Sequence, residues 1–223
     1  MAPARVLVTR RLPPGGLDPL VAAGHELVEH PGDRALGHEA LVEAVRSVDA
    51  VVCLLTDPID RQVLEAGAAG SLRVVANVAV GYDNIDVAAA AELGIAVCNT
   101  PGVLDETTAD LAFLLVLSAC RLASDAERDL RAGDWHGWGI TQYLGEDVHG
   151  AVLGLVGYGR IGRAVARRAE GFGMAVMHHT RSDTGVRGWT PSLDDLLAGS
   201  DVVSLHVPLT DGTRHLIGPA ELA

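Results

Sequence analysis

The sequence predicts an α/β protein built on two parallel sheets with helices covering them. Short runs rich in β-branched residues alternate with segments that carry apolar residues at helical spacing. The later runs VLGLV (152–156) and DVVSLHV (201–207) are mostly apolar, as expected of strands that are buried on both faces. Strands that alternate with helices form parallel sheets through right-handed crossovers.

The first half of the chain contains five candidate strands, at 6–9, 25–29, 50–54, 74–78 and 95–98, with helical segments at 38–47 and 61–67. The sequence NTPG at 99–102 is a turn signal. A long helix is expected over 105–121, with Asp105 as its N-cap. A segment rich in Trp and Gly then leads to a second alternating set. We therefore divide the chain into residues 1–98 and residues 99–223.

Composition narrows the class of protein. The chain has 223 residues, a net charge of −12 and 48% hydrophobic residues, which indicates a globular protein and argues against nucleic acid or an anionic membrane as partner. All 17 basic residues are arginine, which excludes chemistry that needs a lysine of this chain. Three widely spaced cysteines predict a reducing compartment without disulfides or a metal site. No apolar run is long enough to span a bilayer, so we expect a cytoplasmic protein.

Three glycines form the strongest motif in the chain. Gly157, Gly159 and Gly162 make a G-x-G-x-x-G pattern that follows the strand at 152–156 and begins a helix. The first glycine permits a tight turn, the second lets a pyrophosphate approach the backbone, and the third lets helix and strand pack closely. We expect these residues to bind a dinucleotide at the start of the helix, as in a Rossmann domain.

The end of the next strand (175–179) indicates which dinucleotide is bound. Enzymes that use NAD place an acidic residue there for the ribose hydroxyls, but this chain has Thr180, Arg181 and Ser182, with no acid before Asp183. A guanidinium and two hydroxyls suit a 2′-phosphate, which predicts that NADP(H) is preferred. The alternative is that Arg181 is a solvated loop charge and NAD(H) is the cofactor.

Three blocks together carry a family resemblance: NVAVGYDNIDVAAAAELGIAVCNTPGVLDETTADLAF (77–113), LGEDVHGAVLGLVGYGRIGRA (144–164) and SDVVSLHVPLTDGTRHLIG (200–218). The chain resembles the D-isomer-specific 2-hydroxyacid dehydrogenases, above all their glyoxylate/hydroxypyruvate reductase branch. The resemblance implies a flavodoxin-like N-terminal substrate domain followed by a Rossmann dinucleotide-binding domain that is incomplete at its C-terminal end.

The resemblance also implies roles for individual residues. It places the substrate carboxylate on the backbone N–H groups of Val80 and Gly81. Independently of the resemblance, a glycine-containing turn after an apolar strand suits an anion. The resemblance also implies that the remaining cofactor contacts come from Thr108, Arg160, Ile161, Val207 and Pro208.

The family's reaction is hydride transfer between a nicotinamide and a small 2-oxo acid, with an arginine, a glutamate and a histidine as catalytic residues. In the family these three residues follow the position of residue 223, so we expect a chain that is truncated at its C-terminus, and we assign no catalytic residue within it. A homodimer is implied for the complete enzyme. The alternative function is a catalytically inactive nucleotide-binding sensor or interaction module that resembles the related corepressors. A weaker alternative is a formate or phosphoglycerate dehydrogenase.

Two smaller features have more than one interpretation. Arg160, Arg163, Arg167 and Arg168 make one side of the glycine-motif helix basic, which we interpret as a solvated helix face. Trp135, Trp138 and Tyr143 stand out in a chain with only 4% aromatic residues, and they pack either against a second subunit or within one chain.

Overall fold

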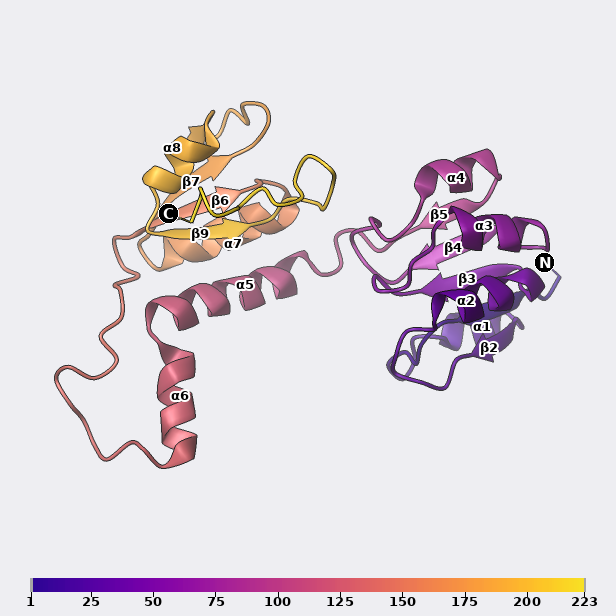
Figure 1. Ribbon diagram of the computed structural model, residues 1–223, viewed down its shortest axis with the longest axis horizontal. Coiled ribbons are helices and arrows are strands. Elements are labelled where there is room, and N and C mark those ends of the chain that lie inside the picture. The colour runs from indigo at the N-terminus through magenta and orange to yellow at the C-terminus, as the bar shows by residue number, and fades with distance from the viewer. Residues whose placement is uncertain (1, 223) are drawn as a thin grey trace. The chain divides into compact units, whose positions relative to one another are not determined.

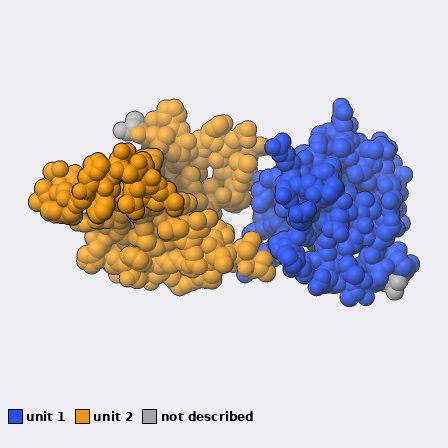
Figure 2. All heavy atoms as spheres, turned by 90° about the horizontal axis from the view of Figure 1, so that it is seen from below, with its two compact units in different colours: residues 1–102 blue, residues 103–223 orange. Residues whose placement is uncertain are grey.

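The computed structural model describes residues 2–222 and divides the chain into two compact α/β units, Met1–Gly102 and Val103–Ala223 (Figures 1 and 2). From the sequence we expected this division after residue 98. The predicted α/β class is confirmed, because every strand pairing in both sheets is parallel. Each unit has its own buried core.

Unit 1 is a five-stranded sheet in the order β2-β1-β3-β4-β5. Its strands are β1 (Arg5–Val8), β2 (Glu26–Glu29), β3 (Ala50–Cys53), β4 (Val74–Asn77) and β5 (Ala96–Cys98). Its helices are α1 (Asp18–Ala22), α2 (His38–Ala44), the 3₁₀ turn η1 (Val45–Ser47), α3 (Arg61–Ala68) and α4 (Val87–Glu92). The helix expected over 38–47 thus ends in a tighter 3₁₀ turn.

Two aspartates start the helices that pack on this sheet. Asp60 accepts a hydrogen bond from Val63 N at 3.0 Å at the start of α3, and Asp86 accepts one from Ala89 N at 2.8 Å at the start of α4. Each carboxylate satisfies a backbone donor that the first helical turn leaves free. Behind these caps, α3 contributes fully buried side chains such as Leu64 to the core of unit 1.

Unit 2 has a four-stranded sheet in the order β8-β7-β6-β9. Its strands are β6 (Val152–Val156), β7 (Ala175–His179), β8 (Trp189–Thr190) and β9 (Val202–Leu205). Its helices are α5 (Asp105–Cys120), α6 (Ala123–Ala132), α7 (Arg160–Gly171) and α8 (Leu193–Ala198). The predicted strands at 152–156 and 175–179 agree with the structure residue for residue.

The central strand of unit 2 is buried on both of its faces. Leu153 and Leu155 belong to the core that α5 and α7 share. Gly154 lies between them and faces the other way, where a Cβ would come within 2.8 Å of Leu196 in α8. The glycine therefore lets α8 approach the sheet opposite α5 and α7, and both helical layers hold β6 in place.

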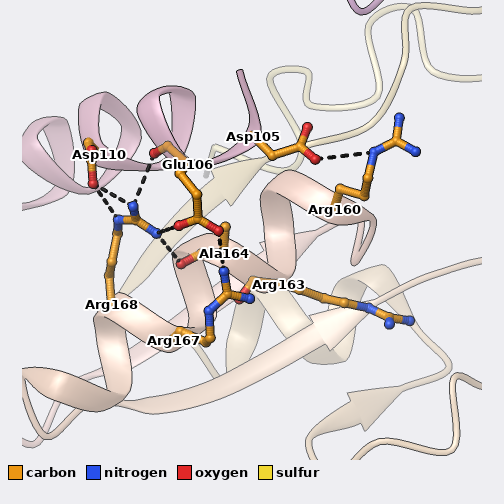
Figure 3. A network of polar contacts seen from close by, with 8 residues as sticks. All are labelled: Asp105, Glu106, Asp110, Arg160, Arg163, Ala164, Arg167 and Arg168. Carbon is orange, nitrogen blue, oxygen red and sulfur yellow. Dashed lines mark hydrogen bonds and ion pairs between the residues drawn. The ribbon is translucent and has the colours of Figure 1, made fainter. Parts of the chain in front are cut away.

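The basic side of α7 is exposed as expected at most of its arginines, but three of the four are paired with acidic residues of α5. Glu106 and Asp110 of α5 pair with Arg168 (Arg168 Nη1 to Glu106 Oε2, 3.0 Å), and Glu106 also pairs with Arg167 (Figure 3). The predicted N-cap is wrong. Leu104 precedes the helix, while the carboxylate of Asp105 lies 3.3 Å from Arg160 Nε. Acidic residues in the first turn of α5 therefore pair with α7 instead of capping the start of their own helix.

The segment between α6 and β6 is largely exposed. Tyr143 donates a hydrogen bond to Asp129 in α6, whereas Trp138 is 82% exposed. The packing of the two tryptophans against a second subunit stays a prediction. In the part of the chain that the structure describes, no single helix is long and apolar enough to cross a bilayer. Helices α5 and α6 meet that criterion only as a pair bent by 72°.

Candidate functional site: a dinucleotide-binding turn and an anion-binding turn

The turn between β6 and α7 is held by close packing at two of its three glycines. Gly157 has a φ of +98°, and a Cβ there would lie 2.7 Å from the carbonyl oxygen of His206. A Cβ at Gly162 would collide with the carbonyl oxygen of Gly157. A side chain at either position would push α7 away from β6 and β9.

Gly159 is different, because a Cβ there would meet no atom of the described chain within 4 Å. It is the N-cap residue of α7, and no side chain caps the free N–H groups of the first helical turn. Protein packing therefore does not explain this glycine. An open space beside uncapped N–H groups, at the positive end of the helix dipole, fits a pyrophosphate.

Arg160 and Ile161 occupy the first two positions of α7, where we expect the pyrophosphate. The side chain of Arg160 remains 63% exposed although it pairs with Asp105. The strand end next to this turn carries Thr180, Arg181 and Ser182, and the Thr180 hydroxyl donates to Ser182 O at 2.7 Å. Arg181 and Ser182 are exposed, and Arg181 forms no ion pair with the described residues.

Two stacked rings join the glycine turn to the end of β7. The ring of Tyr158 lies 3.8 Å from that of His178 at 19°, and His178 Nε2 is 2.8 Å from the Thr184 hydroxyl. His178 is fully buried. Burial, and secondly the positive charge of Arg163, lower the pKa of His178 below its ordinary value. A neutral imidazole at this point supports the loop that follows β7.

The remaining predicted cofactor contacts lie at the end of β9. Val207 and Pro208 follow this strand, and Val207 reaches the turn, because its Cγ1 would lie 3.1 Å from a Cβ at Gly157. Thr108 of α5 is exposed and lines a hollow of about 410 Å³ that Ser204 and His206 also line. The structure thus brings α5, β9 and the glycine turn together within unit 2.

In unit 1, the predicted carboxylate-binding turn is oriented by hydrogen bonds that its backbone carbonyl groups accept. The carbonyl of Ala79 accepts from Thr100 N at 2.9 Å, and that of Val80 accepts from Asn99 Nδ2 at 2.8 Å. In a trans peptide the N–H points opposite to the C=O. The N–H groups of Val80 and Gly81 therefore point away from β5, and no described residue accepts a hydrogen bond from them.

Sequence reasoning missed the amide side chains that hold this turn. Asn77 donates to Gly81 O at 2.9 Å, and Asn84 donates to Asp57 O at 3.0 Å. Asn99 makes the contact to Val80. A signal was present, because Asn77 ends β4 and Asn99 directly follows β5, which is its neighbour in the sheet. Parallel neighbours end at the same edge, so polar residues at both ends converge.

The described residues contain no group of three or more His, Cys, Asp or Glu side chains that could hold a metal ion. Two histidines near the glycine turn are each engaged by a hydroxyl group. His206 Nε2 lies 2.9 Å from Ser204 Oγ, and burial lowers the pKa of His206. His178 has Thr184 as its partner.

Comparison with known proteins places this geometry in one family. Residues 113–223 match the family model described as D-isomer specific 2-hydroxyacid dehydrogenase, NAD binding domain. The glyoxylate reductase of Korarchaeum cryptofilum is 48% identical over 226 residues, which are 98% of this chain and 67% of that protein. The chain belongs to the D-isomer-specific 2-hydroxyacid dehydrogenase family.

Solved structures agree with this assignment. The TT0316 protein of Thermus thermophilus is 42% identical with a TM-score of 0.91, over 98% of this chain and 69% of that one. A glyoxylate reductase from Paecilomyes thermophila is 35% identical with a TM-score of 0.82, over 100% of this chain and 70% of that one. As a 2-hydroxyacid dehydrogenase family member, the chain is an oxidoreductase, and unit 2 is its nicotinamide-dinucleotide-binding domain.

Two glycine substitutions should separate packing from ligand binding. We expect Gly157→Ala to lower the free energy of unfolding by about 2 kcal/mol or more, because of the positive φ and the contact with His206. We expect Gly159→Ser to change it by less than about 0.5 kcal/mol, since the space is open and serine is a good N-cap. The same Gly159→Ser chain should lose nucleotide affinity at least about tenfold. Urea unfolding and nucleotide fluorescence measure both, and unchanged affinity would refute the pyrophosphate assignment.

Acid should destabilise the fold through His178. Its folded-state pKa lies below the ordinary value of 6.5, so the unfolded chain binds more protons and stability falls as pH drops below about 6.5. His178→Phe keeps a ring against Tyr158 and removes this titration, so its unfolding free energy should depend less on pH. His136→Phe at an exposed position is the control and should keep the wild-type pH dependence. Equal pH dependence in the wild type and His178→Phe would contradict the assignment.

Proposed function

We propose that the protein is an NADPH-dependent reductase of small 2-oxo acids of the glyoxylate or hydroxypyruvate type. The observation that carries this proposal is the open space at Gly159, at the uncapped start of α7. The cofactor preference rests on Arg181, because the strand end beside that turn carries a guanidinium where an enzyme that uses NAD has an acid.

The substrate proposal rests on unit 1. Two outward N–H groups, at Val80 and Gly81, suit one carboxylate, because neutral backbone donors stabilise an anion without adding charge. Relatives named glyoxylate reductase, at 48% and 43% identity, support glyoxylate as the type of substrate.

In this proposal the chain's own residues bind the cofactor and the substrate and orient them. The first turn of α7 holds the pyrophosphate, Thr180, Arg181 and Ser182 hold the adenosine end, and the Val80–Gly81 turn holds the substrate carboxylate. When bound, the reduced nicotinamide supplies the hydride. We assign no catalytic acid among residues 2–222, since His178 and His206 are engaged by hydroxyls and have lowered pKa values.

The substrate class is tested by titrating 2-oxo acids into the NADPH complex of the 223-residue chain, followed by the fluorescence of the reduced nicotinamide. We expect glyoxylate and hydroxypyruvate to bind more tightly than pyruvate and phosphohydroxypyruvate. Asn99→Ala frees the carbonyl of Val80 and should raise the Kd for the 2-oxo acid about tenfold while NADPH affinity stays unchanged. Tight nucleotide binding without binding of any 2-oxo acid would contradict the reductase and favour a nucleotide-binding sensor.

Cofactor choice is tested at Arg181. Arg181→Asp should lower NADPH affinity at least about tenfold and raise NADH affinity, because a carboxylate repels the 2′-phosphate and accepts hydrogen bonds from ribose hydroxyls. Arg187→Asp makes the same charge change in the same exposed loop and serves as the control. Nucleotide titrations followed by fluorescence give both constants. NADPH affinity that is unchanged in Arg181→Asp, or lost equally in Arg187→Asp, would count against Arg181 as the phosphate ligand.

A further inference from the structure

One of the four arginines on α7 differs from the other three. Arg160, Arg167 and Arg168 each form an ion pair with an acidic residue of α5. Arg163 forms no ion pair with any residue in 2–222, and Figure 3 shows its side chain extending away from those acids. A guanidinium without a carboxylate therefore lies in the first turn of the dinucleotide-binding helix.

The side chain of Arg163 is held in place although it lacks a counter-ion. Its Nε donates a hydrogen bond to Tyr158 O at 3.2 Å. The guanidinium carbon lies 5.6 Å from the centre of the Tyr158 ring, within the range of a cation–π contact. These contacts fold the side chain back over the glycine turn and reduce the rotamer freedom that a bound ligand would otherwise have to remove.

The rings beneath Arg163 belong to the side of the turn where the adenosine end of the cofactor is expected. Tyr158 stacks on His178, and the neighbouring strands β6 and β7 are in register with Val156 opposite His179. His178 also contacts Thr184 in the loop that contains Arg181. The charge of Arg163 lowers the pKa of His178, which agrees with a position near the end of β7.

We propose that Arg163 is a second cation for the 2′-phosphate of NADPH, approaching from α7 while Arg181 approaches from the end of β7. This inference rests on the proposed function, because only NADP(H) carries that phosphate. A phosphate monoester has a charge near −2 and three acceptor oxygens, more than one guanidinium satisfies. Two guanidinium groups from opposite sides would neutralise it in a chain whose net charge is −12.

A different role for an unpaired cation at this helix start is binding of the pyrophosphate. NADH and NADPH share the pyrophosphate, so the two roles predict different selectivity. Loss of Arg163 lowers both affinities equally if it binds the pyrophosphate, and lowers only NADPH affinity if it binds the 2′-phosphate.

The experiment measures the affinity of the 223-residue chain for NADPH and NADH by fluorescence titration, without turnover. For Arg163→Gln we expect the Kd for NADPH to rise about tenfold and the Kd for NADH to stay within about twofold. Adenosine 2′-monophosphate and adenosine 5′-monophosphate, as competitors, test the same point without a nicotinamide. Only the 2′-phosphate should lose affinity in Arg163→Gln.

Arg167→Gln is the matched control, because it makes the same charge change on the same helix at an arginine that pairs with Glu106. Both of its nucleotide affinities should stay within about twofold of wild type. Circular dichroism confirms the fold of each variant.

Arg163→Lys keeps the charge but loses the planar fork, and should raise the Kd for NADPH about threefold with NADH unchanged. It carries the test if Arg163→Gln does not fold.

Two results would overturn the role of Arg163 while leaving the proposed function intact. The first is an equal loss of NADPH and NADH affinity in Arg163→Gln. The second is a wild-type preference for NADPH that Arg181→Asp abolishes and Arg163→Gln leaves intact. A wild-type chain that binds NADH as tightly as NADPH overturns the proposed cofactor, and the role of Arg163 with it.

Discussion

In both units, neighbouring strands run parallel, so their carboxyl ends meet at one edge of each sheet. Both candidate binding turns depend on this constraint. In unit 1, β4 and β5 end side by side, and Asn99 reaches the carbonyl of Val80. In unit 2, β6 and β9 end side by side, and the carbonyl of His206 lies against Gly157. Neither contact could form if one strand of the pair ran in the opposite direction.

At the glycine turn, packing and ligand binding make separate demands on the same short segment. Gly157 and Gly162 are needed because backbone atoms come too close for a Cβ, whereas Gly159 faces open space. The turn is therefore rigid where it contacts the sheet and accessible at the start of α7. A rigid turn holds the N–H groups in fixed directions before a ligand arrives, which reduces the entropy lost on binding.

Charge is arranged locally in a protein that is acidic overall. The first turns of α5 supply three carboxylates to α7, and they engage Arg160, Arg167 and Arg168 (Figure 3). These pairs are partly exposed, and each contributes little to stability by itself. Their larger consequence is that they distinguish the arginines of α7. Three have a carboxylate partner, and Arg163 has none among the described residues. An anionic cofactor then meets positive charge at defined points of a surface that otherwise repels it.

The order of residues was sufficient to predict the α/β class, the glycine turn, and every strand except the short edge strand β8, to within about a residue or two at each end. Periodicity and glycine spacing are local properties, so they can be recognised without the fold. The partners of polar groups emerged only from the folded chain: Asp105 binds Arg160 instead of capping α5, Asn99 orients the Val80 peptide, and Arg163 is left without an acid. These partners are brought together by helix packing and strand order, and a side-chain contact between residues distant in sequence leaves no periodic trace in the chain.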